Sequence, residues 1–363
     1  MHLIAALRTI CLRFPKWGQV RVKVFVVGID CATEAGKVGL APAAFDDGHV
    51  VLGEVCFCRK GRTVADEVAS MILGQDCPVL LSIDAPLGWP TEMRTALLNH
   101  QAGAWLTVSA DHMFRRETDR FIHERVGKRP LDVGADRIAR TAHAALSLLH
   151  DIGQCIGTQI DLAWQRDLDG VSAIEVYPAA TLTARGFRAD GYKKTAQRAE
   201  RREILRSLES EMDVTGNRVL LEGNADALDA VVCVLAARDF LEGKAIPPDD
   251  PATAAREGWI WTRPPLDSMK PVLALRRSQA SQRSAHREKL LDLELDGVIT
   301  ELKGMRATDV YRKRVLCPCC RAQVFQMWPF GWDAHAARCA GLLSSPEADR
   351  KAEFKTKFNQ LFR

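Results

Sequence analysis

The sequence predicts an α/β domain, in which a mixed sheet is flanked by helices, followed by a small C-terminal zinc-binding module. Two mainly apolar runs that each end on an aspartate, residues 24–30 and 78–84, predict the sheet. A group of cysteines and one histidine between residues 317 and 339 predicts the module. The chain has 363 residues, of which 47% are hydrophobic, and this suffices for a sizeable core.

The first predicted strand, residues 24–30, consists of apolar or small residues until it ends on Asp30. Such runs are typical of strands that are buried on both faces. A buried carboxylate needs a cation, a hydrogen-bond donor or water, which makes Asp30 a candidate ligand. Taken alone, it could equally be an aspartate that caps the following turn.

Two more strands are expected over residues 38–45 and 50–58. Both runs are mainly apolar, and Asp46-Asp47-Gly48 between them favours a hairpin turn. Pro42 would weaken the first of these strands or mark it as an edge strand. With residues 24–30, the two runs predict a three-stranded meander.

A helix is expected over residues 63–73, where Thr63 can cap it, and a fourth strand follows over residues 78–84. Joining the first strand to the fourth through a helix gives a parallel pair by a right-handed crossover. We therefore expect Asp30 and Asp84 at one edge of the sheet, where ligands of open α/β sheets bind.

The remaining elements of the domain are two helices and one short strand before a last apolar helix. They are expected over residues 135–149 (amphipathic helix), 173–178 (a strand that contains Glu175 and is broken by its proline), 196–212 (polar helix) and 223–243. The last helix begins with Asp226 and Asp229, which share one face because they are three residues apart. They either join a site at the sheet edge or only complement the positive helix N-terminus.

If these carboxylates meet, their repulsion forbids an empty and fully ionised site. Hard divalent cations with oxygen ligands, Mg²⁺ or Mn²⁺, relieve that repulsion. Two such ions about 3.5–4 Å apart clamp the attacking and leaving oxygens of an in-line phosphoryl displacement. The pattern therefore favours a metal-dependent enzyme that carries out phosphoryl chemistry.

The order of elements resembles the ribonuclease H fold, and the helix after Asp226 is similar to the corresponding helix of Holliday-junction resolvases. Five short motifs occur in order, namely G-I-D at 28–30, I-D-A-P at 83–86, R-E-T-D at 116–119, E-V-Y-P at 175–178 and D-A-L-D-A at 226–230. Together they resemble a bacterial family, domain of unknown function 429, described as predicted ribonuclease H-like nucleases. The resemblance covers about residues 22–262.

This resemblance implies a set of site residues. The metal ligands would be Asp30, Asp84 and one or both of Asp226 and Asp229, with Glu175 as an additional catalytic candidate. Arg116 and Asp119 would complete the site on the substrate side, since an arginine fork suits a phosphate. Better-studied nucleases of this fold commonly have glutamate at the position of Asp84, which is one methylene shorter.

The C-terminal module is predicted from Cys317, Cys320, His335 and Cys339. Cys-x₂-Cys followed by His-x₃-Cys is the spacing of one tetrahedral zinc site, and Cys319 is a spare thiol. The alternative is that these residues are close by chance. A finger of this size would need the metal in order to fold, so the zinc would be structural. Its partner would be DNA, RNA or protein.

The expected organisation is an extension (1–21), the ribonuclease H-like domain (22–263), a basic helical linker (264–315), the zinc-finger-like module (316–345) and a C-terminal helix (346–363). Residues 271–363 hold 17 lysines and arginines against 10 aspartates and glutamates. A basic tail is compatible with nucleic acid, although solvated helix faces give the same balance.

Three functional hypotheses follow. The first is a nuclease that uses Mg²⁺ or Mn²⁺ and positions nucleic acid with its zinc module. The second is a non-catalytic scaffold whose finger binds nucleic acid or a protein, and the third is chemistry on a nucleotide or another small phosphorylated substrate. No apolar run approaches the roughly 20 residues of a membrane span. Eleven cysteines without a secretory signal favour a cytoplasmic protein with reduced thiols.

Overall fold

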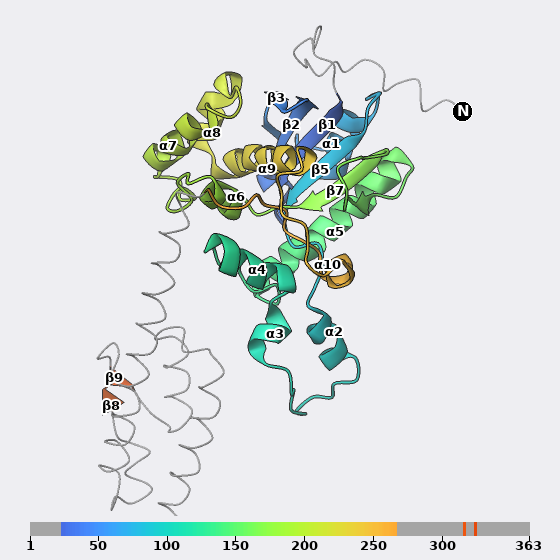
Figure 1. The fold of residues 1–363 in the computed structure, drawn as a ribbon, viewed down its shortest axis with the longest axis vertical. Coiled ribbons are helices and arrows are strands. Elements are labelled where there is room, and N and C mark those ends of the chain that lie inside the picture. Colours follow the sequence, from blue (N-terminus) through green and yellow to red (C-terminus); the bar gives the residue numbers. More distant parts are fainter. Residues whose placement is uncertain (1–22, 267–314, 317–322, 325–363) are drawn as a thin grey trace, which may run out of the picture. The chain divides into compact units, whose positions relative to one another are not determined.

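The computed structural model describes residues 23–266, 315–316 and 323–324 (Figure 1). The chain divides into two units, residues 1–271 and 272–363. In the second unit, strand β8 (Val315–Leu316) pairs antiparallel with β9 (Gln323–Val324). None of the described helices is long and apolar enough to cross a membrane.

The first unit contains one mixed sheet flanked by helices, as the sequence predicts. Its strands lie in the order β3-β2-β1-β5-β7-β6, and β4 also pairs with β2. Strand β1 is antiparallel to β2 and parallel to β5, and β7 is parallel to both β5 and β6. The strands are β1 (Val24–Asp30), β2 (Gly39–Asp46), β3 (His49–Leu52), β4 (Cys56–Phe57), β5 (Val79–Asp84), β6 (Asp161–Leu162) and β7 (Val171–Glu175).

The predicted meander is confirmed, but its third strand is divided into β3 and β4. Strand β2 is an interior strand because β1 lies on one side and β3 and β4 lie on the other, so the edge position expected from Pro42 is wrong. Pro42 instead lies where β3 has ended and β4 has not begun, and its carbonyl accepts from the Gly53 N–H at 2.7 Å. The proline has no N–H to offer there, which fits a gap in the ladder.

The helices flank this sheet. They are α1 (Val64–Ile72), α2 (Thr91–Leu97), α3 (Ala110–Phe114), α4 (Glu117–Val126), α5 (Asp136–Ile156), α6 (Pro178–Ala184), α7 (Arg198–Leu208), α8 (Arg218–Gly223), α9 (Ala225–Leu241) and α10 (Pro251–Glu257), with 3-10 turns at Ala35–Lys37 and Thr215–Asn217. The amphipathic helix predicted from residue 135 is α5, which runs two turns further. Pro178 begins α6 and does not break a strand, as a proline at the first helical position can.

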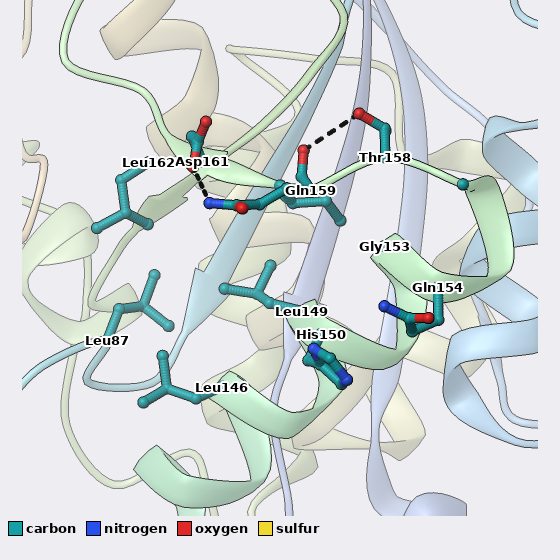
Figure 2. A pocket seen from close by; sticks show the side chains of 12 residues that line it. Leu87, Leu146, Leu149, His150, Gly153, Gln154, Thr158, Gln159, Asp161 and Leu162 are labelled. Atoms are coloured by element: carbon teal, nitrogen blue, oxygen red, sulfur yellow. Dashed lines mark hydrogen bonds between the residues drawn. The ribbon is translucent and has the colours of Figure 1, made fainter.

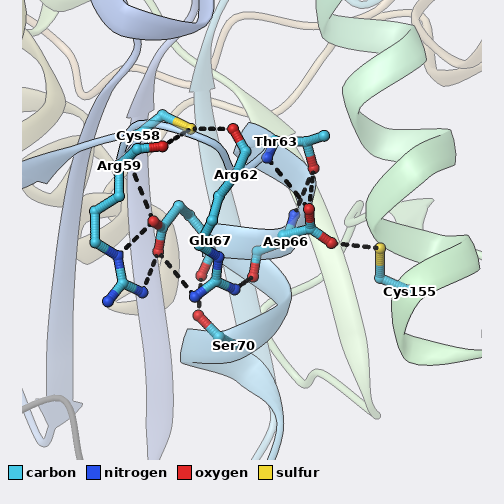
Figure 3. Close-up of polar contacts among 8 residues, drawn as sticks. All are labelled: Cys58, Arg59, Arg62, Thr63, Asp66, Glu67, Ser70 and Cys155. Atoms are coloured by element: carbon cyan, nitrogen blue, oxygen red, sulfur yellow. Dashed lines mark hydrogen bonds and ion pairs between the residues drawn. The ribbon is translucent and has the colours of Figure 1, made fainter. Parts of the chain in front are cut away.

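The start of α1 is capped as its sequence predicts. Thr63 accepts from the Asp66 N–H at 3.0 Å, and the Asp66 carboxylate accepts from the Thr63 N–H at 3.2 Å, which is a capping box (Figure 3). Next to it, buried Glu67 accepts two hydrogen bonds from the Arg59 guanidinium at 2.6 and 2.7 Å. These contacts fix the helix that leads from the meander to β5.

The core has one layer on each face of the sheet. Side chains of β1 alternate between two clusters: Val24 and Val26 face α9, whereas Phe25, Val27 and Ile29 face α1 and α5. Figure 1 shows α9 lying across one face of the sheet. Burial on both faces accounts for the unbroken apolar run of β1.

The backbone of α9 lies directly on two glycines of the sheet. A Cβ atom added to Gly28 would stand 2.1 Å from the Ala230 carbonyl oxygen, and one added to Gly39 would stand 2.5 Å from that of Asp226. The Ser82 hydroxyl also donates to the Cys233 carbonyl at 2.7 Å. This close packing brings the early turns of α9 next to the ends of β1 and β5 (Figure 1).

Candidate functional site

Three carboxylates converge at the carboxyl ends of the parallel strands. Asp30 and Asp84 are register partners at the ends of β1 and β5, and Asp229 comes from α9. One oxygen from each of the three lies within 4.8 Å of the others. The expectation that Asp30 and Asp84 share one sheet edge is confirmed.

Helix α9 brings Asp229 to the strand ends. Asn224 caps the helix by accepting from the N–H groups of Asp226 and Ala227 at 2.7 and 3.1 Å. Asp229 follows one turn later and is only 1% exposed, among side chains that are almost all buried. A buried carboxylate at this position requires polar partners.

Those partners come from the loop between α6 and α7. The Tyr192 hydroxyl donates to Asp229 Oδ1 at 2.7 Å, and Lys193 Nζ lies 2.6 Å from Asp229 Oδ2. Neither residue was predicted from the sequence. Tyr192 is one of three tyrosines in the chain, but nothing in its spacing connects it to the aspartates.

The surroundings raise the pKa values of Asp30 and Asp84 and so favour their neutral, protonated forms. Burial raises the pKa of Asp30 well above its usual range, and the charges of Asp229 and Asp84 raise it further. Burial likewise raises the pKa of Asp84 to about 7, although Lys193 opposes this shift. Burial acts to lower the pKa of Lys193, but the three carboxylates outweigh it and keep the ammonium charged.

The raised pKa of Asp84 predicts a pH-dependent stability of the metal-free protein. Its folded-state pKa of about 7 exceeds the unfolded value of about 3.9, so its stabilising contribution is complete below the unfolded pKa and is lost as the pH rises through 7. In EDTA, Asp84→Asn should therefore raise the Tm most at pH 8, less at pH 5, and least near the unfolded pKa. Exposed Asp76→Asn is the control, and equal effects of both variants at pH 8 would contradict the prediction.

Asp226 is not one of the three converging carboxylates. It lies in the first turn of α9, is partly exposed, and its backbone carbonyl faces Gly39. Burial and the neighbouring charge of Asp229 raise its pKa. Of the pair predicted from the sequence, Asp229 is therefore the one that the helix brings to Asp30 and Asp84.

Glu175 and Arg116 form a buried ion pair next to this cluster, because Glu175 ends β7 beside Ile83 of β5, and its charge contributes to raising the pKa of Asp84. The two Glu175 oxygens accept from Arg116 Nη1 and Nη2, both at 2.7 Å, and Oε2 also accepts from the Leu87 N–H at 2.9 Å. The remaining Arg116 donors reach Asp119 at 2.9 and 3.1 Å and the Glu257 carbonyl at 3.1 Å.

This arrangement bears on the roles expected for three residues. Arg116 is 1% exposed and all five of its N–H donors are used, so none is left for a phosphate. Both oxygens of Glu175 are taken by a guanidinium, and Asp119 completes that ion pair. The three side chains bind one another, so this arrangement does not support the catalytic role expected for Glu175 or the substrate-binding role expected for Arg116 and Asp119.

Glu257, at the end of α10, binds both ends of the segment that contains α2 and α3. Its Oε1 accepts from the Thr91 N–H at 2.6 Å, and its Oε2 accepts from the Glu117 N–H at 2.8 Å. Gly88 packs against the Glu257 backbone so closely that a Cβ atom would lie 2.6 Å from it. The loop that leaves Asp84 is thereby held in place.

A separate cleft of about 670 Å³ lies beside α5 (Figure 2). Leu146, Leu149 and His150 of α5 line one side, and Gln159 and Asp161 line the other. None of the three converging carboxylates lines this cleft. The predicted zinc ligands Cys317, Cys320, His335 and Cys339 lie outside the described residues, as do the extension and the C-terminal helix.

Fold and site together define an α/β protein with an acidic cluster at the carboxyl ends of its parallel strands. Residues 28–253 match the family described as "Protein of unknown function (DUF429)", and the chain belongs to this family. A search of proteins with curated functions finds no match. The match begins at Gly28, two residues before Asp30, and includes every member of the carboxylate cluster.

Proposed function

We propose that the protein is a divalent-metal-dependent nuclease, which hydrolyses phosphodiester bonds in nucleic acid at Asp30, Asp84 and Asp229. The observation that carries the proposal is the convergence of these three carboxylates within 4.8 Å at the end of a parallel strand pair. Three buried or partly buried acids have no structural need to meet, because their mutual repulsion opposes it.

The donor set fits Mg²⁺ or Mn²⁺. All three side chains offer carboxylate oxygens, the ligands that hard divalent ions prefer, and no thiol or imidazole joins this group within the described residues. Such an ion would supply Lewis-acid stabilisation of charge on phosphate oxygens. Asp30, Asp84 and Asp229 would hold it, and Tyr192 would fix the orientation of Asp229 through its hydrogen bond.

The fold of the domain supports the same proposal. We infer a ribonuclease H-like fold from an antiparallel β1-β2-β3 meander, a helical crossover to parallel β5, and a late helix that delivers the third carboxylate. Fold alone does not fix activity, so the carboxylate cluster remains the main argument.

The C-terminal segment would bind the nucleic acid. The spacing of Cys317, Cys320, His335 and Cys339 supports one structural zinc ion. Strands β8 and β9 precede and follow the Cys317–Cys320 segment in the sequence. The excess of basic residues after position 270 supports an interaction with phosphates.

The test is a titration of Mn²⁺ into the full chain after its zinc content has been measured, where one zinc per chain is expected. We expect Asp30→Asn to weaken Mn²⁺ binding and to reduce hydrolysis of labelled DNA or RNA by at least about 100-fold, because it removes a ligand charge. The control, Asp76→Asn, removes an exposed carboxylate outside the site. Unchanged turnover in Asp30→Asn would eliminate the nuclease assignment.

The second candidate is a non-catalytic scaffold, and one observation favours it. Both oxygens of Asp229 already have partners within the chain, Tyr192 and Lys193, so part of the cluster is compensated without a metal ion. Nucleic-acid or protein binding that survives removal of all three carboxylates, together with absent Mn²⁺ binding, would identify the scaffold.

A further inference from the structure

Lys193 is an exposed residue whose charged end reaches a buried acid. Its side chain is 61% exposed, yet Nζ lies 2.6 Å from an oxygen of Asp229, which is 1% exposed. The ammonium also contributes to the electrostatics of Asp30 and Asp84, both of which it favours in the ionised form. The lysine therefore adds a positive charge at the solvent side of the carboxylate cluster.

The backbone around Lys193 is held by a buried arginine. Arg201 is fully buried and donates to four backbone carbonyls, those of Tyr192 at 2.6 Å, Lys194 at 2.9 Å, Thr195 at 3.0 Å and Glu222 at 2.9 Å. A buried guanidinium needs hydrogen-bond acceptors, and these carbonyls supply them. The same hydrogen bonds fix the backbone of the loop between α6 and α7 around Lys193. Tyr192, buried and bonded to Asp229, anchors the same loop from the other side.

The charges of the cluster favour one divalent ion over two. When all three carboxylates are ionised, as metal binding requires, they and the ammonium carry a formal charge of −2, which a single divalent ion neutralises. A second ion would give the cluster a net positive charge, with Lys193 among the repelling groups.

We propose that Lys193 takes the place of a second metal ion, so that the site binds one divalent ion and presents the lysine ammonium to a phosphate oxygen of the substrate. This inference rests on the proposed function, because it describes the same carboxylate site. An ammonium is a compact point charge with three donors and suits a phosphate oxygen. It makes Lys193 a substrate-binding residue that Asp229 and Arg201 hold in position.

The test counts the Mn²⁺ ions bound per zinc-loaded full chain, and subtracts those that remain in Asp30→Asn. We expect one ion in the wild-type protein and two in Lys193→Met, because the competing charge is gone. Lys193→Arg keeps the charge and should bind one ion. Lys194→Met is the matched control, since its exposed side chain neighbours Lys193 in the sequence, and it should also bind one.

Each outcome decides the proposal. Two Asp30-dependent ions in the wild-type protein, or one in folded Lys193→Met, would overturn the role of Lys193 and leave the carboxylate metal site intact. If the wild-type protein binds no Asp30-dependent ion, the metal site and the proposed function fail together. Thermal unfolding of each variant verifies that it is folded before its ions are counted.

Discussion

Arg116→Met is expected to destabilise the protein by about 3–5 kcal/mol, the usual cost of removing one partner from a buried ion pair. Asp119 and Glu175 would remain in the core without their cation, and both are almost fully buried in the native protein. Methionine fills a similar volume, so the loss reports the unpaired charges and not a cavity. Denaturant unfolding at pH 7 measures the effect.

This destabilisation should depend on pH. Burial raises the pKa of Glu175 even in the native protein, where Arg116 opposes the shift, and the pKa would rise further in the variant. A carboxyl with a raised folded-state pKa stabilises the fold below its unfolded pKa of about 4.3 and loses that contribution as the pH rises. The deficit of Arg116→Met should therefore be smaller near pH 4.5 than at pH 7.

Arg140→Met is the matched control, since Arg140 pairs with Asp136 on the surface of α5 and its side chain is 74% exposed. Exposed pairs contribute little to stability, so no measurable change is expected. Equal unfolding midpoints for Arg116→Met and Arg140→Met would show that the buried network does not stabilise the domain.

Gly28→Ala should cost about 3 kcal/mol of stability, because the new methyl group would lie 2.1 Å from the Ala230 carbonyl oxygen. A backbone atom of a buried helix cannot move aside as the end of a flexible side chain can. Either α9 shifts away from β1 or the strand bends. We also expect weaker Mn²⁺ binding, because a shift of α9 carries Asp229 away from Asp30.

Gly36→Ala makes the same chemical change where the added methyl group meets no atom within 4 Å. It should leave both the unfolding midpoint and Mn²⁺ binding unchanged. A normal midpoint for Gly28→Ala would mean that the contact between α9 and β1 is not as close as the structure has it. Normal Mn²⁺ binding in a destabilised Gly28→Ala protein would show that the packing of α9 on β1 does not determine the position of Asp229 in the carboxylate cluster.

Much of the site could be predicted because its residues end apolar runs. The buried runs of β1 and β5 indicated strands, the helix between them indicated a parallel pair, and these two facts place Asp30 beside Asp84. Asp229 could be predicted because an apolar helix of this kind has to pack on the sheet. The pattern of apolar residues and the right-handed crossover between parallel strands were enough to predict these positions.

The rest depended on contacts that have no local signal. Glu175 ends a strand as Asp30 does, and only the position of Arg116, which lies 59 residues earlier, distinguishes an ion-paired acid from a candidate ligand. Lys193 lies in a loop without periodicity, and its place at the site depends on the hydrogen bonds of Arg201. Such pairings arise from the tertiary fold alone.

The Glu257 side chain accepts one hydrogen bond from each end of the segment between Thr91 and Glu117, and it thereby fixes where this segment leaves and rejoins the domain. One side chain joins both ends of that segment, so its interior can change in length without altering where it leaves and rejoins the domain. The entropy of closing a longer loop rises only slowly with its length. The domain thus has a position beside the carboxylate edge where new sequence can be accommodated while the geometry of the carboxylate cluster is preserved.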